Sequence, residues 1–471
     1  MITPDILTQL QAVLGNANVF TDAETLHEYG SDETENLSFP PSVLVKPATT
    51  QEVAGVLKIA FENAIPVTPI GARTGLSGGA LSVHKGIGLS VERMNRIIEI
   101  DEKNLQLTVQ PGVITEVLQQ AVIEKGMYYP PDPSSKGSCF IGGNIAENSG
   151  GPHALKYGVT KDYVLNLEVV LPNGEVIQTG ANTLKNSTGY NLTQLMVGSE
   201  GTLGIITQAV LKLIPYPDKN ILMLVPFFSA TKACEAVSAI FRAGIMPSAI
   251  EFMERDAIDW VMKFVDGLTV PVKDEVQAHL LIEVDGNDMD ELFKQAERIN
   301  EVLLNYECDE ILFADTADQK EALWKMRRRV AEAVKSHSVY KEEDTVVPRY
   351  ELPRLLEGVK AIGKKYNFKS VCYGHAGDGN LHVNIIKGDM SDEDWNTKLP
   401  IGIREIFELT VSLKGTLSGE HGIGWVQKNY MDIAFSSTEL MLMRGIKQLF
   451  DPKNILNPGK IFPDSLSTGS R

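Results

Sequence analysis

The sequence predicts an α+β protein built from two or three domains, and three observations lead to that prediction. The chain has 471 residues, which is longer than one ordinary domain. Its first half alternates short apolar strands with three glycine-rich stretches. Its second half has apolar strands at 221–228 and 279–284, with helices between and after them. That order is typical of an α+β domain with an antiparallel sheet.

The charge composition of the chain narrows the kinds of molecule that it could bind. Lys and Arg total 44 and Asp and Glu total 61, so the net charge is 44 − 61 = −17. An acidic chain is poorly suited to nucleic acid or to an anionic membrane surface. We therefore expect no nucleic-acid partner, and we expect any anionic substrate to meet a local basic cluster.

The cysteines and the N-terminus favour a cytoplasmic protein. The four cysteines form no CxxC pattern, which is typical of reduced thiols in a reducing compartment. Residues 1–5 have neither the basic start nor the apolar core of a signal peptide. No apolar run reaches the length of a transmembrane helix. We expect a cytoplasmic protein that a partner could hold at a membrane.

The local elements of the first half follow from periodicity and capping. Thr49 and Glu52 form a capping-box pattern ahead of a helix with apolar residues at helical spacing. Thr115 is the expected N-cap of another helix. The remaining expected elements are a helix at 3–14, a helix at 116–125, strands at 43–45, 86–90 and 105–109, and a hairpin formed by 164–171 and 175–179.

Residues 71–80 form the first glycine-rich stretch, between two apolar strands. Successive small residues let backbone N–H groups converge on an anion, and a pyrophosphate suits such a nest. The stretch is neither a Rossmann G-x-G-x-x-G nor a Walker loop. A dinucleotide bound by another fold and a plain turn both remain open at this point.

Two further glycine-rich stretches lie at 141–151 and 198–206. A proline-rich path at 130–139 leads into the first of them. The second enters a strand that ends at 215–217, where we place a domain boundary. Together the three stretches could wrap an elongated ligand that carries phosphates and rings.

A rare concentration of histidines marks 374–384 and 418–422. Three of the chain's eight histidines lie there. His375, His382 and Glu420 offer two nitrogen ligands and one oxygen, a set that suits Zn²⁺, Mn²⁺ or a similar ion with positions left open. Residues 381–384 alternate like a strand, so His382 and Asn384 share a face. A polar turn with satisfied histidines is the alternative.

These segments resemble a known family. The three glycine-rich stretches look like the FAD-binding domain of the vanillyl-alcohol oxidase / p-cresol methylhydroxylase superfamily. Together with Gly-His-x-Gly-Asp-Gly-Asn-Leu-His and Ser-Gly-Glu-His-Gly, the chain is similar to the FAD-linked D-2-hydroxyacid dehydrogenases. This family includes D-lactate dehydrogenases, the glycolate oxidase flavin subunit and D-2-hydroxyglutarate dehydrogenase. The resemblance spans about Pro40 to Phe462.

The resemblance implies a fold and a domain plan. It implies a two-part FAD-binding domain of p-cresol methylhydroxylase type at 1–215, an antiparallel-sheet α+β substrate-binding cap domain at 216–420, and a C-terminal segment at 421–471 that completes the flavin site. Arg73, Thr74 and Gly75 stand where some members carry a flavin-linking histidine, so non-covalent FAD is implied. The implied FAD-binding residues are Ile70, Gly71, Ala72, Arg73, Thr74, Gly75, Gly78, Pro133, Ser134, Gly137, Ser138, Gly142, Gly143, Asn144, Asn148, Gly150, Gly201, Ile205, Ile206 and Asn454.

The resemblance also assigns the substrate-binding residues. Arg327 lies at the edge of the apolar stripe of an expected helix at 320–335 and matches the family's carboxylate-binding arginine. An internal ion pair, or a side chain that reaches solvent, is the alternative. Lys341, Asn384 and His421 are the other implied substrate contacts, although Lys341 taken alone reads as part of a charged loop.

The same family match assigns His375, His382 and Glu420 to a divalent metal, Zn²⁺ by preference with Mn or Fe as alternatives. The ion would lower the pKa of a 2-hydroxyacid's hydroxyl, and His421 would accept that proton as general base while hydride leaves Cα for flavin N5. Neighbouring residues in extended chain point apart, so Glu420 and His421 need a bend. Gly419 and Gly422 permit one.

Three functions remain to be weighed. The first is the FAD- and metal-dependent dehydrogenase. The second is a metal hydrolase, which leaves the glycine-rich stretches without a role. The third is a non-catalytic flavin subunit, which the presence of His421 and all three metal ligands disfavours. No cysteine-rich iron–sulfur segment is present, so we expect electrons to pass to an electron-transferring flavoprotein, a cytochrome, a quinone or partner subunits. We also expect a homodimer.

Overall fold

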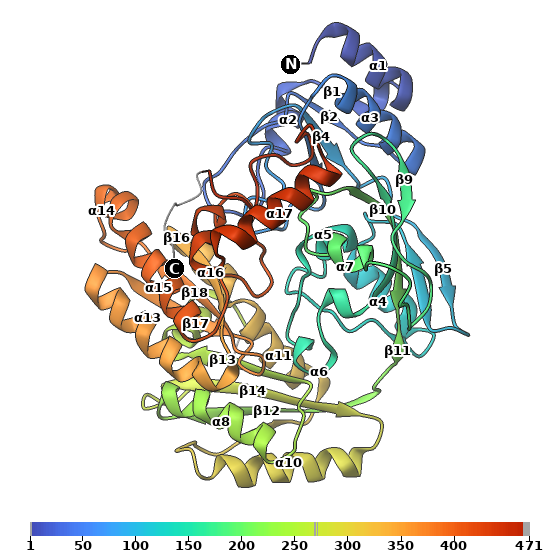
Figure 1. Cartoon of the computed structure of the whole chain (residues 1–471). Coiled ribbons are helices and arrows are strands. Elements are labelled where there is room, and N and C mark those ends of the chain that lie inside the picture. Colours follow the sequence, from blue (N-terminus) through green and yellow to red (C-terminus); the bar gives the residue numbers. More distant parts are fainter. Residues whose placement is uncertain (1, 268–269, 271, 465–471) are drawn as a thin grey trace. The chain divides into compact units, whose positions relative to one another are not determined.

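The computed structural model describes residues 2–267, 270 and 272–464 (Figure 1). The chain divides into two compact units. Unit 1 comprises Met1–Gly150, Val159–Tyr216 and Glu420–Arg471, and unit 2 comprises Gly151–Gly158 and Pro217–Gly419. Unit 2 thus includes a short segment, Gly151–Gly158, that lies in the middle of unit 1's sequence.

The first sheet of unit 1 has the strand order β1-β2-β4-β3, with β2, β3 and β4 parallel. Its strands are β1 Val19–Phe20, β2 Val43–Val45, β3 Val67–Ile70 and β4 Ile87–Ser90. The helices of this part are α1 Pro4–Leu14, α2 Ala23–Glu28 and α3 Thr50–Glu62. Leu10 of α1 and Leu57 of α3 are fully buried in one core with Val45 and Leu89. The predictions for the helix at 3–14 and the strand at 43–45 are confirmed.

The second sheet of unit 1 is antiparallel, with the order β5-β6-β10-β8-β9. Its strands are β5 Ile97–Asp101, β6 Gln106–Val109, β8 Val164–Val170, β9 Val176–Gln178 and β10 Ile205–Lys212, and a separate pair joins β7 Met127–Tyr128 to β11 Ile214–Pro215. The predicted hairpin of 164–171 and 175–179 is confirmed as β8 and β9.

The other helices of unit 1 are α4 Thr115–Ile123, α5 Ile141–Glu147, α7 Leu192–Met196, α16 Met431–Ala434 and α17 Ser437–Phe450. Short 3-10 turns lie at Asn16–Asn18, Thr160–Asp162 and Lys428–Tyr430. The prediction that Thr115 caps a helix is wrong. The N-cap is Ile114, and the Thr115 hydroxyl instead donates to the Asn144 side-chain oxygen.

Unit 2 is organised on a seven-stranded antiparallel sheet with the order β15-β12-β14-β13-β17-β18-β16. The strands are β12 Lys219–Phe227, β13 Ala249–Glu254, β14 Ala278–Gly286, β15 Leu312–Ala314, β16 Tyr340–Val346, β17 Lys369–Gly374 and β18 Asn380–Ile386. The predicted antiparallel α+β architecture of the second half is therefore confirmed.

The helices of unit 2 are α6 Ala154–Tyr157, α8 Ala230–Arg242, α9 Arg255–Phe264, α10 Met289–Leu303, α11 Ala317–Arg328, α12 Val330–His337, α13 Leu352–Tyr366, α14 Asp392–Thr397 and α15 Leu399–Ser412, with a 3-10 turn at Arg349–Glu351. The single helix predicted at 320–335 is wrong, because α11 ends at its C-cap Arg329, whose φ is −89° and ψ is 0°. Val330 and Val334 on the second helix lie in the same core as Met326 on the first. Within the described part of the chain, no helix has the length and apolarity needed to cross a membrane.

Candidate functional site

The first glycine-rich stretch is an open loop that follows β3. Arg73 has a left-handed φ of 63°, and its guanidinium turns away to pair with Glu28 at 3.0 Å and to lie 4.3 Å from the Tyr29 ring centroid. Within the described residues, no hydrogen bond uses the backbone amides of 72–77. A run of unused amides can bind an anion such as a phosphate. Arg73 therefore contributes backbone, not charge, to this loop.

The second stretch lies beside the first. α5 begins at Ile141, and a Cβ added at Gly71 would lie 3.9 Å from the Gly143 Cα. A Cβ at Gly143 or at Gly75 would meet no atom within 4 Å, so open space remains at both glycines. Asn148 ends α5 in the left-handed conformation, with φ 57°. The two stretches therefore form a backbone-lined surface with space for a ligand.

The third stretch packs on the end of α5. The amides of Gly198 and Glu200 donate to the carbonyls of Ile145 and Ala146, each at 2.9 Å. Gly201 has φ +65° and its Cβ position lies 2.4 Å from Pro69 Cγ, so only glycine fits there. All three predicted glycine-rich stretches thus meet in unit 1.

The other predicted FAD-binding residues differ in their exposure and in the elements that carry them. Ser134, Gly137 and Ser138 are exposed in a turn, whereas Pro133 is buried. Ile205 and Ile206 begin β10. The remaining predicted positions, Ile70, Ala72, Thr74, Gly78, Gly142, Asn144 and Gly150, lie on or between the stretches described above.

The C-terminal segment joins the glycine-rich stretches through a residue that sequence reasoning missed. Asn457 is buried and donates its side-chain amide to Gly79 O at 3.0 Å and to Glu200 O at 2.8 Å. Asn454, the predicted contact, is instead an exposed turn residue with φ 50°. The two asparagines lie three positions apart, and the role of Asn454 at FAD stays a prediction.

A buried acidic pair lies behind the second and third stretches. Burial, together with repulsion from Glu200, raises the pKa of Glu147 well above its ordinary value. Burial lowers the pKa of Lys460 to about 8, and the Lys460 ammonium donates to Gly79 O and Leu81 O. Glu200 accepts the Ile423 and Gly424 amides at 2.8 and 2.7 Å. These last bonds hold the backbone just after His421.

In unit 2, His375 and His382 lie at the junction of β17 and β18. Their ring centroids are 5.3 Å apart with the rings nearly perpendicular. Glu251 of β13 lies 2.8 and 2.9 Å from His375 Nδ1 through its two oxygens. A carboxylate on one ring nitrogen fixes the orientation of the ring, as the partners of metal-ligating histidines do. Sequence reasoning missed Glu251.

Glu251 also pairs with Arg327, the predicted substrate-binding arginine. Arg327 Nη2 lies 2.7 Å from Glu251 Oε2, and the two side chains are 4% and 0% exposed. Its guanidinium carbon is 5.0 Å from the Tyr373 ring centroid. Arg327 Nε and Nη2 are buried, and neither makes a hydrogen bond among the described residues, so the contact of Nη2 with Glu251 is an ion pair without hydrogen-bond geometry. The internal ion pair considered from sequence is thus present, with two nitrogens whose N–H groups make no hydrogen bond.

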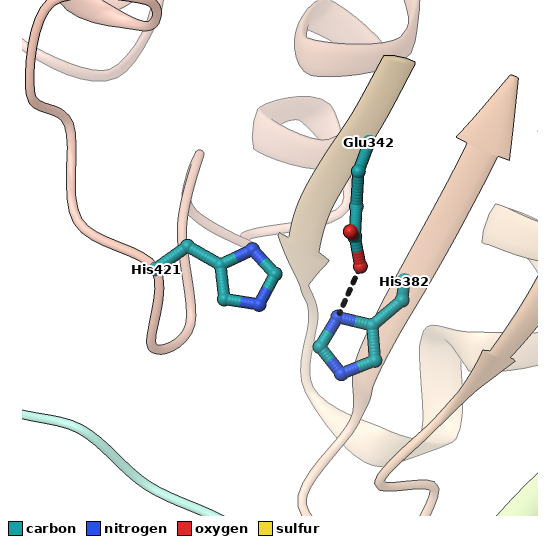
Figure 2. Close-up of side chains that lie close together, drawn as sticks. All are labelled: Glu342, His382 and His421. Atoms are coloured by element: carbon teal, nitrogen blue, oxygen red, sulfur yellow. Dashed lines mark ion pairs between the residues drawn. The ribbon is translucent and has the colours of Figure 1, made fainter. Parts of the chain in front are cut away.

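Two more carboxylates lie beside His382. Asp344 Oδ1 is 3.6 Å and Glu342 Oε1 is 3.9 Å from His382 Nδ1. Figure 2 shows Glu342 on one strand reaching the His382 ring on the next. Burial, with the nearby Glu342 charge, raises the pKa of Tyr373 well above its ordinary value. This sheet face therefore concentrates buried negative charge around two imidazoles, as cation sites do.

Asn384 and Lys341 lie on opposite faces of the sheet. Asn384 is fully buried, pairs in register with Glu342, and has a side-chain oxygen without a partner among the described residues. Lys341 precedes Glu342 on β16, so its side chain points to the other face. Its ammonium lies 5.9 Å from the Trp395 ring centroid. This placement gives no support to Lys341 as a substrate contact on the face that carries His382.

The segment leading to Glu420 and His421 is anchored in unit 2. Ser418 Oγ and the Gly419 amide donate to Asp344 Oδ2 at 2.8 and 2.9 Å. Asp344 is also the register partner of His382. Glu420 and His421 follow directly and begin the last segment of unit 1.

A further, partly buried histidine contact was not expected from sequence. His153, in the short segment Gly151–Gly158, lies 2.9 Å from Glu283 of β14. Ser248 Oγ and Trp324 Nε1 donate to the same carboxylate at 2.9 and 3.3 Å. This network explains why the segment groups with unit 2.

Comparison with known proteins adds independent information. A model of the FAD binding domain matches residues 41–180, and a model of the FAD linked oxidases, C-terminal domain, matches residues 216–461. Glycolate oxidase subunit GlcD of Bacillus subtilis (strain 168) is 39% identical, covering 98% of this chain and 97% of the relative. D-lactate dehydrogenase of Anaerostipes hadrus is 37% identical, covering 98% of each chain.

Two further likenesses bear on fold and type. D-2-hydroxyglutarate dehydrogenase of Stutzerimonas stutzeri (strain A1501) is 33% identical over 98% of this chain and 100% of its own. The solved structure of p-cresol methylhydroxylase with substrate bound has a TM-score of 0.81 at 19% identity, covering 98% of this chain and 96% of that one. The second likeness confirms the predicted p-cresol methylhydroxylase-type fold.

Proposed function

Because the chain belongs to the family of FAD-linked oxidases, of D-lactate, glycolate or D-2-hydroxyglutarate dehydrogenase type, we propose that it oxidises a D-2-hydroxyacid to the 2-oxoacid. The observation that carries the proposal is the buried face around His375 and His382, where carboxylates and one arginine surround two imidazoles. Such a face suits a cation and a small anionic substrate together. We propose a cytoplasmic location and an external electron acceptor.

The residues of unit 1 fit FAD. The unused amides of 72–77 suit a pyrophosphate, and the open space at Gly75 and Gly143 suits an approaching ligand. The Arg73 side chain is engaged with Glu28, so we propose a non-covalent cofactor bound mainly by backbone. When bound, FAD would accept a hydride from the substrate.

The residues of unit 2 fit a divalent metal. Glu251 lies on the Nδ1 side of the His375 ring, so Nε2 is the nitrogen that we propose as the metal ligand. His382 lies beside Asp344, which also holds the Gly419 amide. Glu420 directly follows Gly419, so its Cα lies about 3.8 Å from the Cα of this anchored residue. We propose His375, His382 and Glu420 as ligands, with Zn preferred over Mn or Fe; the ion would acidify the substrate hydroxyl.

His421 is the proposed base, and the local backbone supports it. Gly422 has φ +77°, which turns the chain directly after His421. Glu200 holds the amides of Ile423 and Gly424, so this turn is fixed on its C-terminal side. Neighbouring side chains in extended chain point apart, so Glu420 and His421 can serve metal and base together only around a bend. His421 would accept the hydroxyl proton as the Cα hydride departs.

Arg327 and Asn384 are the proposed substrate contacts. Arg327 is ion-paired with Glu251 through Nη2, and its buried Nε and Nη2 make no hydrogen bond among the described residues, so their N–H groups could donate to a carboxylate. Asn384 retains a buried side-chain oxygen that could accept from a substrate hydroxyl. A buried polar atom without a partner is costly, so a ligand that pairs with these atoms would bind favourably.

The test is spectroscopic. Purified protein should be yellow, and a D-2-hydroxyacid should bleach it without oxygen. His421→Ala should keep the colour and lose the bleaching, whereas His27→Ala, at an exposed histidine of α2, should behave as wild type. A chelator should stop turnover and leave FAD bound. A colourless protein that cannot be reconstituted with FAD would contradict the proposal.

A glycolate-oxidase-type subunit within a larger complex is the second candidate. The observation that favours it is the 39% identical relative, which is named as a subunit. The isolated chain should reduce an artificial dye with a D-2-hydroxyacid if it is a complete dehydrogenase. Flavin reduction without dye turnover by the isolated chain would favour the subunit.

A further inference from the structure

Unit 2 carries a groove at the edge of its sheet, and the lining of the groove includes none of the residues described around His375 and His382. Residues of 289–304, on α10, line one side, and residues of 308–315, on and before β15, line the other. This surface, called here the α10 groove, has a volume of about 830 Å³. That volume is the size of a site for a small molecule or for several side chains.

The α10 groove exists because α10 packs on the two strands next to the edge of the sheet, β12 and β14 (Figure 1). The edge strand β15 pairs with β12 on one side only. Phe313 of β15 is in register with Met223 of β12, which is fully buried. Phe313 itself is 45% exposed and lines the groove. The apolar face of the sheet therefore continues beyond the helix that covers it.

The α10 side of the groove is a largely apolar helix stripe. Its residues lie at i, i+4, i+7, i+8, i+11 and i+15 from Met289, which is the spacing of one helix face. Phe293 and Leu304 in this stripe are 52% and 73% exposed. With Phe313 across the groove, they place exposed apolar surface on both sides. A contiguous patch of this kind marks an interaction site.

The charged side chains that line the α10 groove are mostly acidic. Four are carboxylates and one is an ammonium, which gives −4 + 1 = −3. The ammonium belongs to Lys320 and is used within the chain, because it donates to the backbone and side-chain oxygens of Asn220 at 2.8 and 2.6 Å. Three of the carboxylates make no ion pair among the described residues: Glu297, Glu310 and Asp315.

The sequence around the groove has the same character. Residues 299–319 contain six acidic residues and neither lysine nor arginine. The whole chain, by contrast, has 44 basic residues for 61 acidic ones. The negative charge at the groove is therefore a local feature and not only a share of the acidic composition. Uncompensated negative charge beside exposed apolar surface is complementary to a basic, partly apolar partner.

We propose that the α10 groove binds an amphipathic helix of another protein, with an apolar face against Phe293, Leu304 and Phe313 and with lysine or arginine on the flanks of that face. A helix laid beside α10 would complete the helical layer over β15. The α10 stripe spans 15 positions, so about four turns of helix fit along its length of roughly 22 Å. Binding at this groove would require neither FAD, nor a metal ion, nor turnover.

Other occupants fit less well. β15 has three residues, and such a short edge strand is a poor template for an added strand. A second copy of this chain has a net charge of −17, and an anionic membrane is also negative, so neither matches the acidic groove. Residues 465–471 contain one arginine and one large apolar residue, too few for an amphipathic helix.

A synthetic peptide is the probe for this proposal. A labelled helical peptide of about 18 residues, with leucine on one face and lysine elsewhere, is titrated with the purified full-length chain while its fluorescence anisotropy is followed. We expect a Kd on the order of 10 μM. Added salt should weaken this binding, because the charges are exposed. The same peptide with glutamate in place of lysine should not bind.

Charge reversal tests the acidic side chains. Glu297→Lys combined with Glu310→Lys should weaken binding of the lysine peptide by about tenfold, because two attractions become repulsions. Asp389→Lys combined with Glu408→Lys is the matched control, since it changes the net charge by the same 2 × 2 = 4 at exposed positions of unit 2 outside the groove. The control should bind the peptide as wild type does.

Two alanine variants of one strand test the apolar contact. Phe313→Ala should weaken peptide binding by about fivefold or more, because it removes a large apolar contact. Leu312→Ala is the control, because neighbouring strand residues point to opposite faces and Leu312 does not line the groove. Urea unfolding followed by tryptophan fluorescence should show that each variant is folded.

A native thiol gives a readout that needs no variant. Cys308 lines the groove and is half-buried, whereas Cys139, Cys234 and Cys372 are buried. Burial raises the pKa of the Cys308 thiol, so its alkylation by a maleimide should be slow. The lysine peptide should slow this alkylation further, as measured by the mass of the intact protein, and the glutamate peptide should not.

Four results would overturn the proposal. The first is no binding of the lysine peptide at protein concentrations up to about 100 μM. The second is equal weakening by the two charge-reversal variants, which would show general attraction to an acidic chain. The third is equal binding of the glutamate peptide, which would show apolar adhesion alone. The fourth is binding of phosphatidylcholine vesicles that Phe313→Ala abolishes, without peptide binding, which would assign the groove to a membrane.

Discussion

Replacing Glu251 with glutamine tests whether the charge balance around His375 depends on one buried carboxylate. Glu251 is fully buried, pairs with Arg327 at 2.7 Å, and lies 2.8 Å from His375 Nδ1. Glutamine keeps the shape of the side chain and removes its charge. Arg327, itself 4% exposed, would then be a buried cation without its counter-charge.

The magnitude follows from the pair's burial. Two unit charges about 4 Å apart interact by about 4 kcal/mol at an effective dielectric constant of about 20. Removal of one partner from a buried pair costs about 3–5 kcal/mol, because the other charge stays desolvated. Glutamine retains one oxygen as an acceptor for the guanidinium, so we expect about 3 kcal/mol for Glu251→Gln.

Urea unfolding followed by tryptophan fluorescence measures this loss in unit 2. Three of the chain's four tryptophans, Trp260, Trp324 and Trp395, lie in that unit. The shift of the urea midpoint, multiplied by the slope of unfolding free energy with urea, gives the change. The double variant Glu251→Gln with Arg327→Met should be more stable than Glu251→Gln alone, since it removes the stranded charge.

Two outcomes would refute the reasoning. The first is a free energy of unfolding for Glu251→Gln that lies within about 1 kcal/mol of the wild-type value, which is the range of an exposed ion pair. The second is a double variant whose loss equals the sum of the two single losses, which would show no coupling. Glu291→Gln is the matched control, because its ion pair with Lys294 spans 3.8 Å between exposed side chains.

Two further predictions concern protonation and backbone shape. Burial raises the pKa of Glu147 well above 4.5, so its contribution to stability is present below pH 4.5 and is lost as pH rises through the folded-state pKa. Near pH 8, Glu147→Gln should release FAD at a higher temperature than wild type, and its release temperature should depend less on pH. Glu175→Gln, at an exposed position, is the control and should release FAD as wild type does. Gly379→Ala should destabilise unit 2 by more than the roughly 1–2 kcal/mol of a left-handed residue, since a Cβ would lie 2.0 Å from Val347 O. Gly388→Ala, with φ +50° and no atom within 4 Å of a Cβ, should cost only that amount, and equal losses in tryptophan-monitored unfolding would contradict the argument.

Local pattern was enough to predict much of the fold. The apolar periodicity of 3–14 and the alternation of 381–384 depend on neighbours a few residues away, and both became the expected elements, α1 and β18. Clusters of glycine predicted three stretches that meet in one unit for the same reason, although the second of them contains helix α5. The resemblance supplied the cofactor and the reaction type, and the comparisons confirmed FAD and the family.

Contacts between distant segments could not be predicted in this way. Glu251, Arg327 and His375 come from β13, α11 and the end of β17, and only the order of strands in the sheet brings them together. The helix breaks at Arg329 although Met326, Val330 and Val334 keep helical spacing and lie in one core, so apolar periodicity along the chain does not record the break.

The sequence by itself therefore determined the residue types available for the chemistry: the histidines, the glycine loops and the arginine. The tertiary structure alone decided their partners. It paired Arg327 with Glu251, turned Lys341 to the opposite face from His382, and selected Asn457 over Asn454 as the buried asparagine. Sheet order, strand alternation and burial are long-range properties, and they decide which polar groups face one another.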